Sequence, residues 1–179
     1  AGIHVTVFER AGGVAEDLRA STWHPPTLDM MADLGFAEEI LREGLIARTF
    51  QHRDRKTGAI AEFDMNLLSG ETDHPYRVQY EQFRYTRLVH ERLKAVAHAS
   101  VKFNSAVSGV TQTGDSVTAI LENGEQYSGD YLIGADGAGS AVRRAIGVEF
   151  EGLTFPERFF VVSTPFDFEA LHFLERLGC

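Results

Sequence analysis

The sequence of 179 residues lacks several features that would place it in particular protein classes. Its one cysteine is the final residue, Cys179, so no disulfide can form within the chain. A reducing, cytoplasmic compartment is therefore expected. No apolar run approaches the roughly 20 residues that a membrane-spanning helix needs. The first residues carry neither the basic region nor the cleavage pattern of a signal peptide.

Positive charge is also scarce. Lysine and arginine total 17 against 26 aspartate and glutamate residues, which gives a net charge of −9. This balance argues against nucleic acid or an anionic membrane as the main partner, although it leaves room for a local phosphate site. The histidines form no His-x-x-x-His pair, so no metal site is predicted. No Gly-x-Ser-x-Gly motif is present either, which argues against a hydrolase.

Short strand-like and helical segments alternate along the chain, and this order predicts an α/β fold. An apolar run at residues 3–9 is expected to form a core strand. Pro25 and Pro26 open a predicted helix that Gly35 closes. Residues 46–65 favour a hairpin, and residues 81–98 carry apolar side chains at helical spacing.

The second half of the chain is richer in predicted strands. Residues 107–111 and 116–121 are expected to pair, and Asn123-Gly124 predicts a type I′ hairpin turn after them. Residues 131–133 read as a buried strand. A further strand is predicted to begin near residue 159, and residues 169–177 have a helical pattern.

The most informative stretch is residues 131–143, Tyr-Leu-Ile-Gly-Ala-Asp-Gly-Ala-Gly-Ser-Ala-Val-Arg. Here a predicted strand leads into Asp136 and a turn of small residues, where the backbone can approach a bound phosphate or sugar. Ser140 is placed to cap the next helix, whose first N–H groups favour anions. The alternative interpretation of these residues is a glycine-rich loop with a surface aspartate and no role in binding.

Glu9 ends the first predicted strand. In a dinucleotide-binding βαβ unit, an acidic residue at the end of the second strand accepts hydrogen bonds from the ribose hydroxyls. Glu9 suits that role, although a solvated strand end would look the same in the sequence.

Several segments, in the same order, resemble the class A flavoprotein monooxygenases, the para-hydroxybenzoate hydroxylase superfamily. Residues 131–143 resemble that family's Asp-Gly fingerprint. Val-Phe-Glu-Arg at 7–10 resembles the end of its second strand, and Leu-Arg-Ala at 18–20 resembles its Arg-Ala segment. Leu-Ser-Gly at 68–70 and Gln-Phe-Arg-Tyr-Thr-Arg at 82–87 resemble the approach to its FAD-contacting helix.

The resemblance implies roles in binding the adenosine and pyrophosphate parts of FAD. Glu9 would hold the adenosine ribose, with Arg10 beside the adenine. Arg19 would reach the pyrophosphate or the nicotinamide cofactor. Gln82 would hydrogen-bond the pyrophosphate–ribityl region of FAD.

The resemblance also implies roles toward NAD(P)H. Asp136, with Gly137 in the same turn, would serve both FAD and NAD(P)H, and Arg143 would contact the reduced nicotinamide cofactor. Surface salt bridging is the alternative for Arg19 and Arg143. No catalytic residue can be named, because most of the family's substrate contacts lie on strands beyond residue 179.

The implied fold is α/β, a Rossmann-like FAD-binding domain interrupted by a β-rich substrate domain. The first domain would comprise residues 1–46 and 76–148, and the second residues 47–75 and 149–179. Both are expected to be incomplete. The family's first strand and its glycine-rich loop would precede residue 1, and its ribityl-binding Gly-Asp motif would follow residue 179. We therefore expect an internal fragment that is inactive alone.

The implied activity is hydroxylation of a phenolic substrate with NAD(P)H and O₂ through a flavin C4a-hydroperoxide. FAD would be the cofactor, and a small aromatic molecule and O₂ the partners. Two alternatives stay open: a related flavoprotein with different chemistry, such as an epoxidase or reductase, and an inert nucleotide-binding fragment. The sequence leaves a homodimer open as well.

Overall fold

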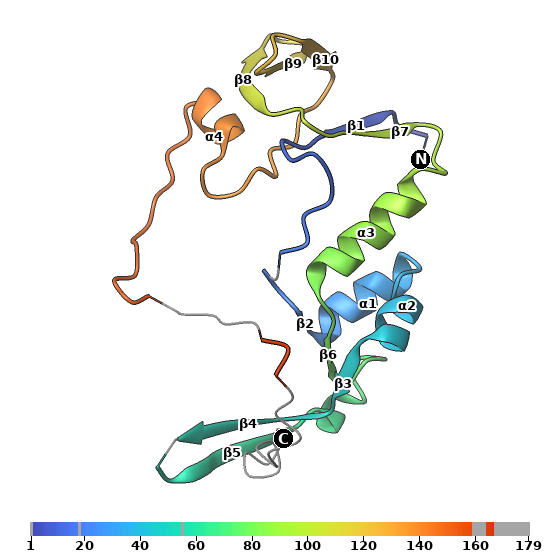
Figure 1. The fold of residues 1–179 in the computed structure, drawn as a ribbon, viewed down its shortest axis with the longest axis vertical. Coiled ribbons are helices and arrows are strands. Elements are labelled where there is room, and N and C mark those ends of the chain that lie inside the picture. Colours follow the sequence, from blue (N-terminus) through green and yellow to red (C-terminus); the bar gives the residue numbers. More distant parts are fainter. Residues whose placement is uncertain (1, 18, 55, 159–163, 167–179) are drawn as a thin grey trace. The chain divides into compact units, whose positions relative to one another are not determined.

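The computed structural model describes residues 2–17, 19–54, 56–158 and 164–166 (Figure 1). By its internal contacts the chain divides into two compact units, Ala1–Ala15 with Arg87–Phe160, and Glu16–Thr86 with Val161–Cys179. The domain boundaries that the sequence predicts at residues 46, 76 and 148 stay a prediction. No helix within the described ranges is long and apolar enough to cross a membrane.

Two short helices begin the unit that contains residues 16–86. Helix α1 (Pro25–Asp33) starts with the two prolines, as predicted, because a proline in the first turn lacks only an N–H that would have had no helical partner. Helix α2 (Ala37–Glu43) follows after Gly35. Leu34 is the C-cap residue of α1 and is exposed.

These helices cover one face of a three-stranded antiparallel sheet. Its strand order is β2 (Thr22–Trp23), β6 (Arg77–Gln79) and β3 (Leu45–Ala47). The core beneath the helices consists of Leu28, Met31, Ala37, Ile40, Val78 and Tyr80. The Trp23 ring packs against this core, and its Nε1 donates to the Tyr80 carbonyl at 2.7 Å. Trp23 therefore packs, partly buried, against the core.

The predicted hairpin is confirmed. Strand β4 (Thr49–Asp54) pairs antiparallel with β5 (Gly58–Asp64), and a short 3₁₀ helix, η1 (Met65–Leu68), follows. The Asp54 carboxylate accepts the backbone N–H groups of Lys56 and Thr57, which close the turn. These hydrogen bonds, first that from Thr57, lower the pKa of Asp54.

A parallel strand pair belongs to the other unit. Strand β1 (Val5–Phe8) pairs with β7 (Ala99–Lys102), in a register that matches Val5 with Ala99. Helix α3 (Gln82–Leu93) precedes β7 and is shorter than the predicted helix over residues 81–98. Figure 1 shows β1 and β7 side by side.

An antiparallel meander follows, formed by β8 (Val107–Gln112), β9 (Val117–Leu121) and β10 (Gln126–Gly129). The predicted hairpins are present, but the predicted type I′ turn is wrong. Gly124 has a positive φ of 87°, whereas Asn123 does not, and a type I′ turn requires both. Gly124 donates to the Leu121 carbonyl, and the Leu121 N–H to Glu125, which gives a three-residue loop with glycine at its left-handed position.

The predicted buried strand at residues 131–133 is also wrong. These residues form no strand, and Tyr131 and Ile133 are 92% and 90% exposed. Val5 and Val7 in β1 are 49% and 44% exposed, although a core strand was expected. Strand side chains are buried when other elements cover the faces of the sheet, and the sheet that contains β1 has only two strands, β1 and β7, in the described residues. The strand predicted near residue 159 and the helix over 169–177 fall outside the described residues.

Candidate cofactor site

Asp136 is fixed at the start of helix α4 (Ala141–Ala145). Its Oδ2 accepts the backbone N–H groups of Ala141 at 2.6 Å and Val142 at 3.1 Å, and its Oδ1 accepts the Ser140 hydroxyl. The hydroxyl and these N–H groups lower the pKa of Asp136, because each favours the charged form. The carboxylate is therefore ionised and held in one orientation.

Ser140 caps the same helix, as predicted. Its Oγ accepts the Arg143 N–H at 2.9 Å, and the residue is buried. Asp136 and Ser140 together occupy the first N–H groups of α4. The anion at this helix terminus is therefore the Asp136 carboxylate itself rather than a phosphate, which differs from the use that the sequence suggested for these N–H groups.

Two of the glycines around Asp136 are required for different structural reasons. Gly137 has a φ of 77°, in the left-handed region that favours glycine. Gly134 lies so close to α4 that a Cβ there would be 2.9 Å from Val142 Cβ. The absence of a side chain at Gly134 therefore allows α4 to pack closely on the turn.

Arg143 connects the turn to the segment after α4. Its Nη1 donates to the Val148 carbonyl at 3.1 Å and its Nη2 to the Ala138 carbonyl at 3.4 Å. Its Cζ is 5.2 Å from the centre of the Phe150 ring. No described carboxylate pairs with Arg143, so the surface salt bridge considered for it does not form within the described part of the chain.

Glu9 lies directly after β1 and folds its side chain back on its own turn. Its Oε1 accepts the Ala11 N–H at 2.7 Å. Its backbone N–H donates to Lys102, and its carbonyl accepts the Ser105 N–H, both at 2.9 Å. The other carboxylate oxygen makes no hydrogen bond with the described residues. Glu9 thus presents an oriented acceptor at the carboxyl end of a parallel strand.

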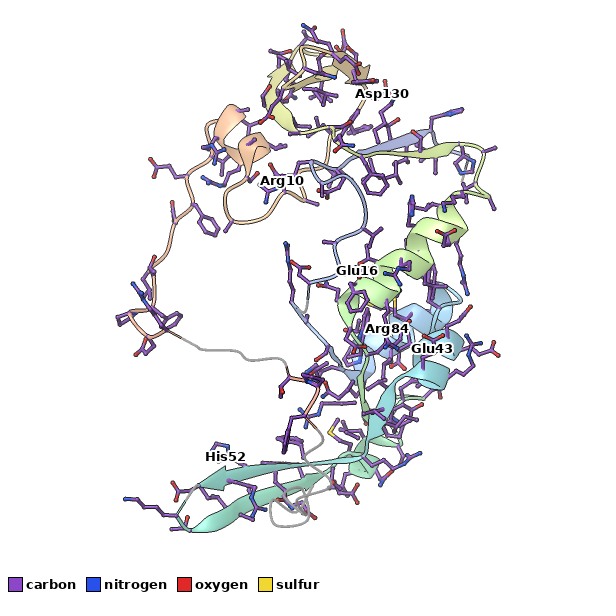
Figure 2. All side chains as sticks on the ribbon, viewed as in Figure 1. Arg10, Glu16, Glu43, His52, Arg84 and Asp130 are labelled. Carbon is purple, nitrogen blue, oxygen red and sulfur yellow. The ribbon has the colours of Figure 1, made fainter. Side chains whose placement is uncertain are left out.

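A cleft of about 360 Å³ opens beside Arg10, which Figure 2 labels. It is lined by Arg10, Asn104, Ser105, Ala106, Leu121, Glu122 and Asn123. Asn104 has a φ of 53°, and its N–H donates to the Ala11 carbonyl at 2.9 Å. Sequence reasoning missed Asn104; its signal is an asparagine two residues after the end of β7, since asparagine tolerates left-handed backbone.

Arg19 and Gln82 belong to the other unit. The Arg19 guanidinium pairs with the Asp17 carboxylate, and both side chains are exposed, which is the salt bridge that was the alternative for Arg19. Gln82 is the exposed first residue of α3, and its N–H donates to the Ala20 carbonyl at 2.9 Å. The structure thereby joins the Arg-Ala segment to the start of α3. The cofactor-binding roles that the family resemblance implies for Arg19 and Gln82 stay predictions.

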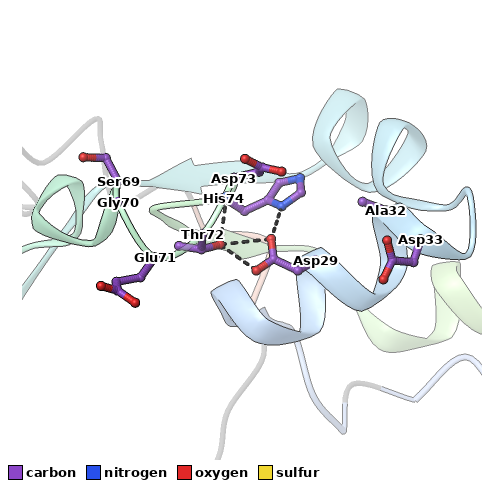
Figure 3. A pocket seen from close by; sticks show the side chains of 9 residues that line it. All are labelled: Asp29, Ala32, Asp33, Ser69, Gly70, Glu71, Thr72, Asp73 and His74. Carbon is purple, nitrogen blue, oxygen red and sulfur yellow. Dashed lines mark hydrogen bonds and ion pairs between the residues drawn. The ribbon is translucent and has the colours of Figure 1, made fainter.

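A second cleft, of about 350 Å³, lies where α1 meets the loop after η1 (Figure 3). His74 is 8% exposed, and its Nδ1 lies 2.6 Å from Asp29 Oδ1. Thr72 Oγ1 donates to Asp29 Oδ2 at 2.7 Å. Hydrogen bonds from His74 and then Thr72 lower the pKa of Asp29. This cluster fastens the loop to α1. Among the described residues, no group of three or more histidine, cysteine or acidic side chains could hold a metal ion.

Comparisons with known proteins give one consistent result. Residues 1–174 match the family described as FAD binding domain. The chain is 33% identical over 177 residues to 6-hydroxy-3-succinoylpyridine 3-monooxygenase of Pseudomonas putida (strain DSM 28022 / S16), covering 97% of this chain and 45% of that protein. It is 29% identical over 175 residues to para-nitrophenol 4-monooxygenase of Pseudomonas sp. (strain WBC-3), covering 96% and 43%.

A solved structure agrees with the sequence matches. The crystal structure of p-nitrophenol 4-monooxygenase from Pseudomonas putida DLL-E4 superimposes with a TM-score of 0.82 at 28% identity, over 86% of this chain and 40% of that one. The chain thus spans less than half the length of the relatives it matches. With the FAD binding domain match over nearly its whole length, the chain belongs to the family of the class A FAD-dependent aromatic monooxygenases.

Proposed function

We propose that the protein containing this chain is an FAD-dependent monooxygenase that uses NAD(P)H and O₂ to hydroxylate a phenolic or related aromatic substrate. The observation that carries the proposal is the Asp136 turn. A family fingerprint is present in the sequence, and its aspartate is held ionised and oriented at α4. The named activities of the matched relatives support the same reaction class.

The residues at the end of β1 fit the adenosine part of FAD. Glu9 has one carboxylate oxygen fixed by Ala11 and one left to accept ribose hydroxyls. The cleft beside Arg10 begins immediately after Glu9 in the chain and is lined by backbone and side-chain polar groups that a purine could contact. Ser105 ties the two together, because its N–H donates to the Glu9 carbonyl and it lines the cleft.

The turn around Asp136 is assigned to the shared region between FAD and NAD(P)H. Asp136 orders the turn through α4, and the left-handed Gly137 exposes backbone for close approach. Arg143 supplies a cation beside this turn, where it can attract nicotinamide cofactor phosphates. Bound FAD would supply the electron transfer from NAD(P)H to O₂, which none of these side chains can perform.

The direct test uses the complete protein reconstituted with FAD. NAD(P)H oxidation is followed with and without a panel of phenols, and the product is analysed by mass spectrometry under ¹⁸O₂. We expect oxidation to be stimulated by one aromatic class and one labelled oxygen atom to enter the product. NAD(P)H oxidation without labelled product would favour a reductase, and an epoxide would favour the related-chemistry alternative.

A protein that retains no FAD would support the inert nucleotide-binding alternative. A cytoplasmic location and a homodimer stay predictions. Cell fractionation tests the first, and gel filtration with light scattering tests the second.

A further inference from the structure

Arg77 in β6 has an unusual environment within its unit. It alternates with Val78, which is completely buried against α1 and α2, so its side chain lies on the other face of the sheet. The Arg77 Nε atom is buried and has no hydrogen-bond partner. No carboxylate in the described residues pairs with the guanidinium. A buried donor without a partner is uncommon and requires an explanation.

Aromatic stacking holds the guanidinium in place without neutralising its charge. Arg77 Cζ lies 4.2 Å from the centre of the Phe50 ring. Phe50 in turn stacks on Phe63, with ring centres 4.6 Å apart and an interplanar angle of 11°. A ring face attracts the cation but accepts no strong hydrogen bond from its N–H groups. The guanidinium of Arg77 is therefore oriented, and no hydrogen bond among the described residues occupies its two Nη groups, which remain for an anion.

Gln79 adds a second donor on the same face of β6, two residues along the strand. Its side-chain oxygen accepts hydrogen bonds from Ser21 at 3.2 Å and from Thr22 at 3.0 Å. These bonds occupy the oxygen and leave the amide NH₂ to donate. Leu45 pairs with Gln79 across the sheet and is exposed, which places an apolar side chain beside the two donors.

We propose that this face of β6 binds the anionic oxygen of an aromatic substrate, with Arg77 as the main donor, Gln79 as the second and Leu45 against the ring. The proposal rests on the proposed function and narrows its substrate class to rings that carry a carboxylate or phenolate. The competing explanation is a carboxylate from another part of the protein, which would neutralise Arg77 internally.

Binding of two matched probes to the complete, FAD-loaded protein separates these explanations. Benzoate carries an anionic group, and benzamide has nearly the same shape without the charge. By titration calorimetry we expect benzoate to bind more tightly than benzamide. Arg77→Gln should weaken benzoate binding about tenfold to a hundredfold, since a hydrogen bond to a charged group is lost, and should change benzamide binding less than about twofold.

Arg48→Gln is the matched control. The Arg48 Cζ also lies over an aromatic ring, 5.2 Å from the centre of Tyr76, but this side chain is exposed. We expect its replacement to leave both affinities unchanged. Arg77→Lys keeps the charge without the planar fork and should retain part of the benzoate preference, which provides a test if Arg77→Gln fails to fold.

The proposal is overturned if the unmodified protein does not prefer benzoate, or if Arg77→Gln and Arg77→Lys keep its full preference. A lower melting temperature with an intact preference would identify an internal carboxylate partner instead. The binding measurement needs no turnover. An Arg77-dependent preference in a protein without monooxygenase activity would therefore sink the proposed function and leave this site standing.

Discussion

The sheet β2–β6–β3 and the parallel pair β1–β7 differ in how completely the described residues cover them. Val78 in the first sheet is fully buried, whereas Val5 and Val7 in the second are close to half exposed. The first sheet is covered by α1 and α2, which lie between β2 and β3 in the chain. Helices adjacent in sequence can therefore bury one sheet, whereas β1 pairs with β7, far along the chain, and residues 131–133 form no strand. The two regions should accordingly respond differently to the same kind of change.

The largest expected effect concerns residues 1–179 made alone. Tyr131 and Ile133 are exposed and form no strand, and Val5 and Val7 lie half exposed in β1, which has a strand partner on one edge alone among the described residues. We expect this polypeptide to aggregate and to retain little FAD, because open strand edges recruit other chains. Gel filtration with visible absorbance, run beside the complete protein, measures both properties. A soluble, monomeric polypeptide that retains FAD, and is therefore yellow, would contradict the expected difference between the sheet β2–β6–β3 and the pair β1–β7.

A core substitution should be the next largest. Ile40→Ala removes a completely buried side chain between α2 and the sheet. We expect it to lower the free energy of unfolding by about 2–5 kcal/mol. Urea denaturation of the complete protein measures this. Met30→Ala, on the exposed side of α1, is the control and should cost far less. Equal losses of unfolding free energy for Ile40→Ala and Met30→Ala would mean that the residues beneath α1 and α2 form no specifically packed core.

Gly134→Ala tests the close packing of α4 in the other unit. The added Cβ would meet Val142 at 2.9 Å, so we expect a loss of about 1–3 kcal/mol from overpacking. Gly139→Ala is the matched control, since nothing lies within 4 Å of a Cβ there. Adding Val142→Ala should recover part of the loss. No recovery in denaturation experiments would argue against a direct clash.

The smallest effect concerns Asp136 and pH. Because its pKa is lowered in the folded chain, it contributes stability that is present above the ordinary aspartate value of about 3.9 and is lost as pH falls through the folded value. Asp136→Asn should cost up to about 1 kcal/mol at neutral pH, as for other helix caps. Melting curves should show this difference closing under acid conditions. For Asp115→Asn, in an exposed loop, the difference in melting temperature from the unmodified protein should not depend on pH in this way. A difference for Asp136→Asn that persists under acid conditions would contradict the role assigned to the Asp136 carboxylate.

Local features of the sequence predicted local structure well. Pro25 and Pro26 marked the start of α1, and Ser140 marked the cap of α4, because a few neighbouring residues determine each of them. The turn after β9 was less predictable. Asn123-Gly124 suits more than one loop length, and only the hydrogen bonds of the paired strands decide between them.

Features that depend on distant residues could not be predicted. Whether residues 131–133 form a strand and are buried depends on residues elsewhere, which their own sequence does not specify. His74 is 45 positions from Asp29, so no local pattern indicates their contact. The roles of Glu9 and Arg10 came from a family resemblance, whereas the adjoining cleft became visible only once Asn104 was placed against their turn.

The most direct test of the account is the FAD affinity of the complete protein and its Glu9 variants, measured by fluorescence titration of the apoprotein. Glu9→Ala should raise the FAD dissociation constant roughly tenfold to a hundredfold, because a charged acceptor for the ribose hydroxyls is lost. Glu9→Gln should have a smaller effect, and Asp115→Ala none. Equal dissociation constants for Glu9→Ala and the unmodified protein would contradict the assignment of β1 to the adenosine site.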